Sequence, residues 1–429
     1  METIKINRVK VLKGEISPPG DKSISHRAII LGAIASGKSR VSNFCPGDDA
    51  LRTVEAFRAL GINIIESGEK EFEIGGKGLY GLQEPANIID AGNSGTTTRL
   101  LAGLLAGQKF FSVITGDASL RSRPMKRVTE PLRMMGAQID GRRGGDFAPL
   151  SIRGGELKPI SYHTPVPSAQ VKSAILLAGL YSSGMTEVIE PIPSRDHTER
   201  MLKTLGARIE TNGARVRIEG GAKLEPFSLS IPGDISSAAF FMVGGTIVPK
   251  SEIIIRQVGI NPLRTGVIEV LQKMGADLKI MELKEEGGEK QADIVVKSAE
   301  LKGIEISGEI IPRVIDELPI LAVAASQAEG TTIIRDAKEL RVKETDRIKA
   351  MVEGLRQMGV EAEELEDGMV ITGPKKLQGA RIFSYGDHRI AMSFIIAGLV
   401  ASGETIIEDT ASIATSFPDF VKLLASLAS

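Results

Sequence analysis

The chain is organised around the stretch Pro18-Pro19-Gly20-Asp21-Lys22-Ser23-Ile24-Ser25-His26-Arg27. Its two prolines favour an extended backbone, and the glycine that follows permits a turn with positive φ. Aspartate and two serines, all helix-capping types, then lead into an apolar run that reaches Ile34. A helix that begins here directs free N–H groups and the cations Lys22 and Arg27 toward one place. This is the chemistry of a small-anion site, although an ordinary capped surface helix would have the same pattern.

The composition is typical of a globular protein with more than one domain. A length of 429 residues is too great for one compact core, so two domains or a repeat are expected. The net charge of −1 and the low aromatic content of 4% argue against a nucleic-acid partner. The single cysteine, Cys45, excludes an internal disulfide and a cysteine-based zinc cluster, and it fits a cytoplasmic protein. The sequence has neither the apolar core of a signal peptide nor an apolar run of about 18 residues, so no membrane partner is expected.

The sequence repeats itself at a pitch of roughly 65 to 85 residues. One marker is a helix end followed by glycine and a small or β-branched residue, as in Leu60-Gly61-Ile62, Met135-Gly136-Ala137, Leu205-Gly206-Ala207, Met274-Gly275-Ala276 and Met358-Gly359-Val360. A second marker is a small-residue apolar helix that stops, in the left-handed conformation, at Gly37, Gly107, Gly184, Gly330 or Gly403. Each repeat is expected to form strand, helix, strand, helix, strand, strand, and the last one is truncated.

These repeats predict an α/β (α+β) fold of two similar domains, each with three βαβαββ units packed around buried helices. The first helix of each unit is apolar almost all round, as in 174–180 and 395–400, which predicts burial. The turns at 16–21 and 229–234 look equivalent and are expected to carry the chain between domains. We therefore expect a discontinuous first domain of residues 1–17 plus 229–429, a second domain of 18–228, and a hinge near 13–21 and 224–234.

A P-loop pattern at 32–39, which ends in Gly37-Lys38-Ser39, does not predict a nucleotide site. A P-loop follows a strand and precedes a helix, and here the expected order is reversed. Searches for metal and nucleophile motifs also find little, because the four histidines show no ligand spacing and no Gly-x-Ser-x-Gly is present. No metal and no cofactor are therefore expected.

Cations recur at the expected helix starts. They lie in segments 22–27, 121–123, 193–197, 341–347 and 385–389 of five repeats. Singly, each is expected to be a solvated charge or an ion pair, but their recurrence indicates a cleft that holds several anionic groups. The turns Asn93-Ser94-Gly95-Thr96 and Ser168-Ala169-Gln170 add N–H and hydroxyl groups, although simple helix capping would have the same pattern. Asp316 and Glu344 add carboxylates that suit proton transfer, although an acid at the start of a buried helix can also be a structural cap.

The sequence resembles the 5-enolpyruvylshikimate-3-phosphate synthase (3-phosphoshikimate 1-carboxyvinyltransferase) family. The matching segments run in family order over nearly the whole chain: 20–27, 92–96, 121–124, 168–170, Arg341-Val342-Lys343-Glu344-Thr345-Asp346-Arg347 and 386–392. The resemblance implies an enolpyruvyl transferase-like inside-out barrel fold and a monomer. It also implies transfer of the enolpyruvyl group of phosphoenolpyruvate to the 5-hydroxyl of shikimate 3-phosphate, in the pathway to chorismate and aromatic amino acids, by an enzyme that glyphosate targets.

The resemblance also implies residue roles. For phosphoenolpyruvate it implies a subsite of Lys22, Asn93, Gly95, Thr96, Arg123, Gln170, Lys343, Arg347 and Arg389. For shikimate 3-phosphate it implies Lys22, Ser23, Arg27, Ser168, Ala169, Gln170, Arg195, Asp316 and Lys343. Catalysis falls to Asp316 as the base on the 5-hydroxyl, Glu344 as the proton carrier for the methylene carbon, and Lys22.

Some positions depart from the family pattern. Thr415, Glu339 and Ser194 stand where many members have lysine, asparagine and tyrosine. The segments 168–170 and 194–197 look like the family's second class, often discussed for glyphosate tolerance, yet Gly95 keeps room for the inhibitor. One alternative is a UDP-N-acetylglucosamine enolpyruvyl transferase, which has Lys-Asn at the place of Lys22-Ser23 and usually a cysteine in the loop at 116–124. A non-catalytic anion-binding repeat protein is another.

Overall fold

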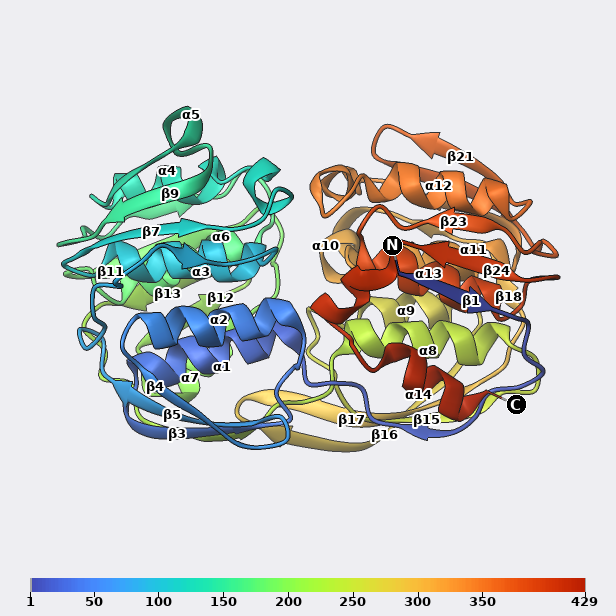
Figure 1. Cartoon of the computed structure of the whole chain (residues 1–429), viewed down its shortest axis with the longest axis horizontal. Helices are drawn as coiled ribbons and strands as arrows, with labels where there is room; N and C mark the ends of the chain where they lie inside the picture. Colours follow the sequence, from blue (N-terminus) through green and yellow to red (C-terminus); the bar gives the residue numbers. More distant parts are fainter. Residues whose placement is uncertain (1, 429) are drawn as a thin grey trace. The chain divides into compact units, whose positions relative to one another are not determined.

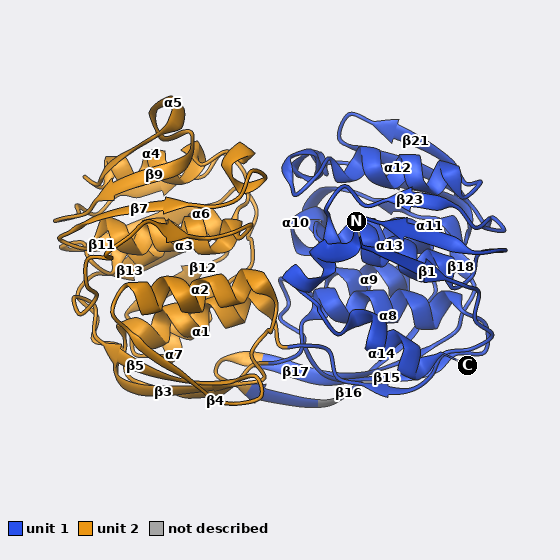
Figure 2. Cartoon of the chain, in the orientation of Figure 1, with its two compact units in different colours: residues 1–19, 232–285, 290–429 blue, residues 20–231, 286–289 orange. Residues whose placement is uncertain are grey.

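The repeats form two compact units. The computed structural model describes residues 2–428. Unit 1 comprises residues 1–19, 232–285 and 290–429, and unit 2 comprises 20–231 and 286–289 (Figure 2). Each unit encloses its own hydrophobic core. Within the described residues the strands form six small sheets, three to a unit (Figure 1), which confirms the predicted fold class.

The sheets of unit 2 share one strand order. A short edge strand pairs in parallel with the next strand, and an antiparallel hairpin completes each sheet. The three sheets, in spatial order, are β14 (Ser228–Ser230), β3 (Ser36–Ser42), β5 (Glu71–Lys77), β4 (Asn63–Gly68); β6 (Ile89–Asp90), β7 (Phe111–Thr115), β9 (Phe147–Arg153), β8 (Gln138–Gly141); and β10 (Ser161–His163), β11 (Met185–Ile189), β13 (Arg215–Glu219), β12 (Ile209–Asn212).

The sheets of unit 1 repeat the pattern. They are β2 (Lys13–Ile16), β15 (Glu252–Gly259), β17 (Glu289–Lys297), β16 (Asp277–Glu286); β18 (Leu301–Lys302), β20 (Ala328–Ile334), β22 (Gly368–Gly373), β21 (Glu361–Leu365), with β19 (Glu305–Ile306) beside β20; and β23 (Arg381–Phe383), β24 (Thr405–Glu408), β1 (Thr3–Ile6). The truncated sixth repeat is completed by β1, which pairs antiparallel with β24.

One helix of each repeat is buried on nearly all sides, as predicted from its composition. In unit 2 these helices are α1 (Lys22–Ile34), α3 (Gly95–Ala106) and α6 (Ala169–Gly179), and in unit 1 they are α8 (Ile235–Ile247), α11 (Leu318–Ser326) and α13 (His388–Gly398). Amphipathic helices accompany them: α2 (Asp48–Ala59), α4 (Lys126–Met134), α7 (His197–Thr204), α9 (Gly266–Lys273), α12 (Arg347–Gln357) and α14 (Phe420–Leu427). Shorter helical turns are α5 (Arg142–Gly145), α10 (Ile311–Val314), η1 (Leu120–Ser122), η2 (Gly308–Ile310), η3 (Lys338–Val342) and η4 (Thr410–Thr415).

The chain passes from one unit to the other in the two similar turns. Strand β2 pairs with β15 in unit 1 but leads directly into α1 of unit 2. Strand β14 pairs with β3 in unit 2 but leads directly into α8 of unit 1. In both turns an aspartate then caps the helix, because Asp21 Oδ1 accepts from Ile24 N at 2.9 Å and Asp234 Oδ1 accepts from Ser236 N at 2.8 Å.

The structure tests two local predictions, the helix stop at Gly107 and the P-loop pattern at 32–39. The expected left-handed stop at Gly107 is wrong, because this residue has φ −91°. Packing leaves no room for a side chain there, since a Cβ would lie 2.2 Å from the ring of Tyr181. The P-loop pattern, by contrast, runs from the end of α1 into β3, the reverse of a nucleotide-binding loop, as inferred. Its Lys38 forms a surface ion pair with Glu73 at 2.9 Å.

Candidate active site

The start of α1 holds two of the predicted cations in different ways. Lys22 is the first residue of the helix, and its Nζ lies 3.0 Å from Asp49 Oδ2. Arg27, one turn later, is buried and uses all three nitrogens of its guanidinium. Its Nε donates to Thr198 Oγ1 at 2.6 Å, Nη1 to the carbonyl of Ser23 at 2.8 Å, and Nη2 to Ser173 Oγ at 2.8 Å. Arg27 thereby joins the N-terminal halves of α1, α6 and α7.

Unit 2 contains positive charge that a bound anion would stabilise. The pKa of Arg27 is lowered to about 10, chiefly by burial. The charge of Glu199 acts in the opposite direction, and the charge of Arg195 adds to the lowering. Two guanidinium groups that repel each other at a helix start favour an anionic ligand.

The start of α3 forms a second polar cluster. Ser94 caps the helix by accepting from Thr97 N, and Asn93 donates to Asp117 Oδ2 at 2.7 Å. Arg123 donates to Asn93 Oδ1 and, at 3.1 Å, to Ser119 Oγ. The predicted Asn93 and Arg123 are therefore in direct contact, although they are 30 positions apart in the sequence.

Gln170 links the start of α6 to α3. Its amide nitrogen donates to Thr96 Oγ1 at 3.0 Å, and its carbonyl oxygen accepts from Arg99 Nη1 at 2.5 Å. Arg99 was missed by the sequence analysis, although an arginine inside an otherwise apolar helix is a signal that could have revealed it. Gly95 lies against the same cluster, since a Cβ there would be 2.9 Å from Arg99 Nη1.

In unit 1 a single buried guanidinium contacts both predicted carboxylates. Arg347, at the start of α12, is 1% exposed and pairs with Asp387 through Nε at 2.8 Å and Nη2 at 3.3 Å. Its Nη2 also donates to Glu344 Oε2 at 2.6 Å. No described residue accepts a hydrogen bond from its buried Nη1, and Asp316 Oδ1 lies 3.5 Å from that atom.

These contacts keep Arg347 charged. Burial by itself lowers the pKa of its guanidinium, but the charges of Asp387, Glu344 and Asp316 together outweigh burial, so the pKa is raised above its usual value. Lys343 adds a second cation, with its Nζ 3.2 Å from Asp316 Oδ1. Asp316 and Glu344 are thus held by neighbouring cations while their side chains remain 13% and 21% exposed.

Arg389 belongs to an adjoining cluster of unit 1. Its Nη1 donates to the main-chain carbonyl of Asp316 at 2.8 Å and lies 3.6 Å from Glu317 Oε1. Glu317 also accepts from Ser236, which in turn accepts from Arg264 at 2.5 Å. Arg264, the cation at the start of α9, is the member of the fourth repeat that the sequence analysis did not identify.

Other motif residues hold the fold together. Arg341 donates to Asp346 and Glu364 at 2.7 and 2.9 Å and to two main-chain carbonyls, so it fastens η3 to the neighbouring hairpin. Thr415, at the end of η4, donates to the carbonyl of Ser412.

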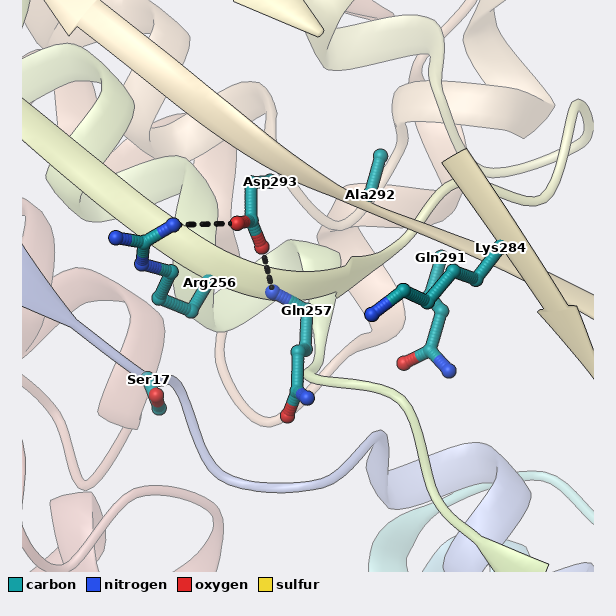
Figure 3. A pocket seen from close by; sticks show the side chains of 7 residues that line it. All are labelled: Ser17, Arg256, Gln257, Lys284, Gln291, Ala292 and Asp293. Carbon is teal, nitrogen blue, oxygen red and sulfur yellow. Dashed lines mark hydrogen bonds and ion pairs between the residues drawn. The ribbon is translucent and has the colours of Figure 1, made fainter. Parts of the chain in front are cut away.

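The pocket drawn in Figure 3, of about 240 Å³, is lined by Ser17, Arg256, Gln257, Lys284, Gln291, Ala292 and Asp293, and none of these is a predicted site residue.

Neither a cluster of metal-ligand side chains nor a membrane-spanning helix occurs in the described part of the chain. Between residues 2 and 428, no group of three or more His, Cys, Asp or Glu side chains could hold a metal ion. In the same range, no helix combines the length and the apolar character that crossing a membrane requires.

Comparisons with known proteins agree over the full length of the chain. The family model described as EPSP synthase (3-phosphoshikimate 1-carboxyvinyltransferase) matches residues 6–424. The 3-phosphoshikimate 1-carboxyvinyltransferase of Citrifermentans bemidjiense is 57% identical over 424 residues, 99% of each chain. That of Geotalea daltonii is 58% identical over 415 residues, 97% of this chain and 96% of the relative.

Solved structures show the same likeness. An EPSP synthase from Acinetobacter baumannii superimposes with a TM-score of 0.90 at 49% identity and covers 100% of this chain and 98% of its own. The enolpyruvyl transferase NikO from Streptomyces tendae has a TM-score of 0.77 at 18% identity, with 99% and 97% covered, which shows the shared fold alone. By its sequence and its structure together, this chain belongs to the EPSP synthase (3-phosphoshikimate 1-carboxyvinyltransferase) family.

Proposed function

We propose that this chain transfers the enolpyruvyl group of phosphoenolpyruvate to the 5-hydroxyl of shikimate 3-phosphate and releases inorganic phosphate. The observation that carries the proposal is Arg347, whose buried Nη1 lacks a hydrogen-bond acceptor among the described residues and lies beside Asp316. The same guanidinium also binds Glu344 at 2.6 Å. An anionic donor at this nitrogen would therefore lie close to two carboxylates, which is what a reaction with two proton transfers requires.

The donor subsite that we propose is cationic. Lys343, Arg347 and Arg389 from unit 1 bind the phosphate and carboxylate of phosphoenolpyruvate, and unit 2 contributes Lys22, Asn93, Gly95, Thr96, Arg123 and Gln170. The geometry supports this set, because Asn93 contacts Arg123 and Gln170 contacts Thr96. Glyphosate, an anion of similar size, would compete for the same subsite.

The acceptor subsite that we propose lies at the other helix starts of unit 2. Ser23 and Arg27 bind the ring and carboxylate of shikimate 3-phosphate, and Lys22 faces both substrates. The 3-phosphate of shikimate 3-phosphate is bound by Ser168, Ala169, Gln170 and Arg195, while Asp316 and Lys343 of unit 1 act at the 5-hydroxyl. The repulsion between Arg27 and Arg195 supports these roles, because the acceptor carries both a carboxylate and a phosphate.

The proposed chemistry is an addition followed by an elimination. Asp316 takes the proton of the 5-hydroxyl as its oxygen forms a bond to C2 of phosphoenolpyruvate, and Glu344, protonated in the filled site, gives a proton to C3. In the second step Glu344 removes a proton from C3, the bond between C2 and the phosphate oxygen breaks, and the proton on Asp316 leaves with the phosphate. Lys22 stabilises the negative charge on the departing phosphate. The carboxylates return to their initial states, so neither a metal nor a cofactor is needed for the balance.

Several finer points belong to the same proposal. The proposed domains are residues 1–17 plus 229–429 and residues 18–228, and they close on the substrates about a hinge near 13–21 and 224–234. The enzyme is a cytoplasmic monomer of the second class of the family. Cys45, its single cysteine, is buried, which suits a reducing compartment. Size-exclusion chromatography with light scattering tests the monomer, and inhibition by glyphosate tests the class.

Phosphate release tests the proposed reaction. The protein is mixed with phosphoenolpyruvate and either shikimate 3-phosphate or UDP-N-acetylglucosamine. We expect release with shikimate 3-phosphate alone. Release with only the nucleotide sugar would identify the alternative transferase, and release with neither would leave an anion-binding protein without this activity.

A further inference from the structure

A buried carboxylate lies behind the loops that we assign to the 3-phosphate of the acceptor. Glu190 follows β11 directly and is 3% exposed. Its Oε1 accepts from Ser168 N at 2.9 Å and from Ser194 Oγ at 2.6 Å. Its Oε2 accepts from Ser194 N at 3.1 Å and lies 2.8 Å from Lys172 Nζ. Each oxygen thus has two donors, which is the full capacity of a carboxylate.

The counterion of Glu190 reinforces the same loops. Lys172 is 2% exposed on α6 and lies 2.8 Å from both Glu190 and Glu199. Its Nζ also donates to the main-chain carbonyl of Ser194 at 3.1 Å. Burial lowers the pKa of this ammonium, but the charges of Glu199 and Glu190 outweigh burial, so the pKa is raised and the lysine remains charged.

Ser194 is held at every polar atom it has. Its N–H and its hydroxyl donate to Glu190, and its carbonyl accepts from Lys172. Arg195 is the next residue in the chain, and Ser168, the other residue tied to Glu190, caps the helix whose first turn contains Gln170. The loop at Ser168 and the loop at Ser194–Arg195 are therefore both held by the carboxylate of Glu190.

We propose that Glu190, with Lys172 as its counterion, is the positioning residue that sets the Ser168 loop and the Ser194–Arg195 loop at the spacing required by the acceptor's 3-phosphate. This inference rests on the proposed function. Glu190 does not touch the substrate in this scheme. It acts through Ser168 and Ser194, so its loss affects acceptor binding far more than donor binding or the chemical step.

Glu190→Gln is the variant that separates these effects. Glutamine keeps the size of the side chain but replaces one oxygen with an NH₂ group, which must face either the Ser168 N–H and Ser194 hydroxyl or the Ser194 N–H and Lys172. In the first orientation the Ser194 hydroxyl can turn to accept from the NH₂ group, but the Ser168 N–H loses its acceptor. In the second orientation the Ser194 N–H and Lys172 both lose theirs. We expect the KM for shikimate 3-phosphate to rise by roughly tenfold to a hundredfold, with less than about a threefold change in kcat and in the KM for phosphoenolpyruvate.

Glu187→Gln is the matched control. It makes the same substitution three residues earlier, on β11, at a carboxylate that accepts hydrogen bonds from Ser161 and Arg217. The control should retain all three kinetic constants. Glu190→Asp, which keeps the charge but shortens the side chain, should show an intermediate KM for shikimate 3-phosphate, and direct titration of each variant with shikimate 3-phosphate should give the same order of Kd.

The outcomes distinguish this proposal from the proposed function. An active wild type whose Glu190→Gln variant keeps its KM for shikimate 3-phosphate refutes the positioning role and leaves the reaction intact, whatever happens to thermal stability. A similar rise in both KM values together with a similar fall in kcat would also refute the positioning role, because such a change indicates a general structural role. An inactive wild type refutes the proposed function itself. If Glu190→Gln does not fold, Ser194→Ala removes one donor to Glu190 and must still raise the KM for shikimate 3-phosphate severalfold.

Discussion

Replacing Arg347 with methionine should destabilise unit 1 by about 3 to 5 kcal/mol, the usual cost of removing one partner of a buried ion pair. The structure explains this size. Arg347 makes two charge-assisted hydrogen bonds to Asp387, which is 0% exposed, and one to Glu344. Asp387 loses its ion pair with Arg347 but keeps the main-chain N–H groups of Arg389 and Ile390, so we expect the lower half of the range. A loss of about 3 kcal/mol corresponds to more than a hundredfold change in the folded-to-unfolded ratio.

Urea unfolding, followed by circular dichroism, measures this effect. Lys349→Met is the control, because it removes a cation from the same helix, α12, where Lys349 is 60% exposed and faces Glu353 at 3.8 Å. A surface pair of this kind contributes less than about 1 kcal/mol. In a double-mutant cycle, Asp387→Asn should cost less in the Arg347→Met background than in the wild type. A loss below about 1 kcal/mol for Arg347→Met, or strict additivity in the cycle, would refute the reasoning.

Three further predictions concern single residues. Asp316→Asn should bind both substrates with nearly unchanged Kd but lower kcat by about a hundred- to ten-thousandfold, and an unchanged kcat would remove Asp316 from the mechanism. Gly95→Ala should raise the KM for phosphoenolpyruvate with little change in the Kd of shikimate 3-phosphate, because the new Cβ would lie 2.9 Å from Arg99 Nη1 and 3.5 Å from Arg123 Nη1; an equal effect on both substrates would contradict this. Burial, followed by the charges of Lys22 and Arg27, holds the pKa of His26 well below 6.5, so the unfolded state binds this proton more readily and the free energy of unfolding should fall as the pH drops below 6.5. His26→Asn should reduce that fall by up to about 1.4 kcal/mol per pH unit in urea titrations, and identical pH profiles would show that His26 does not contribute.

The repeats and buried helices were predictable because they rest on local patterns. A helix with apolar residues on all sides, such as α6, must be buried in any fold. The hairpin between β12 and β13 likewise follows from local turn chemistry, because Asn212-Gly213 favours a tight turn. Gly107 shows the limit of this reasoning. A side chain there would clash with Tyr181, which is 74 positions away in the sequence, so only the folded structure shows why glycine is needed.

The site was predictable where the family resemblance supplied motifs and less so where tertiary contacts decide. Arg99, Lys172 and Glu190 lie outside the motifs, and their partners come from other elements. A charged residue inside an apolar helix, as at Lys172, was a readable signal of a buried ion pair. The sequence could not indicate which carboxylates would neutralise it. The assigned substrate roles of Lys22, Arg27, Asp316 and Glu344 remain predictions, which the experiments above test.

The most direct test of the central claim is to follow the carbon that is transferred. The protein is incubated with phosphoenolpyruvate labelled with ¹³C at C2 and with shikimate 3-phosphate, and ¹³C and ³¹P NMR spectra are recorded together. The account predicts that the labelled carbon becomes an enol ether on the 5-oxygen of shikimate 3-phosphate as an equal amount of inorganic phosphate appears. Phosphate release with the label in free pyruvate, or unchanged spectra with both substrates bound, would contradict it.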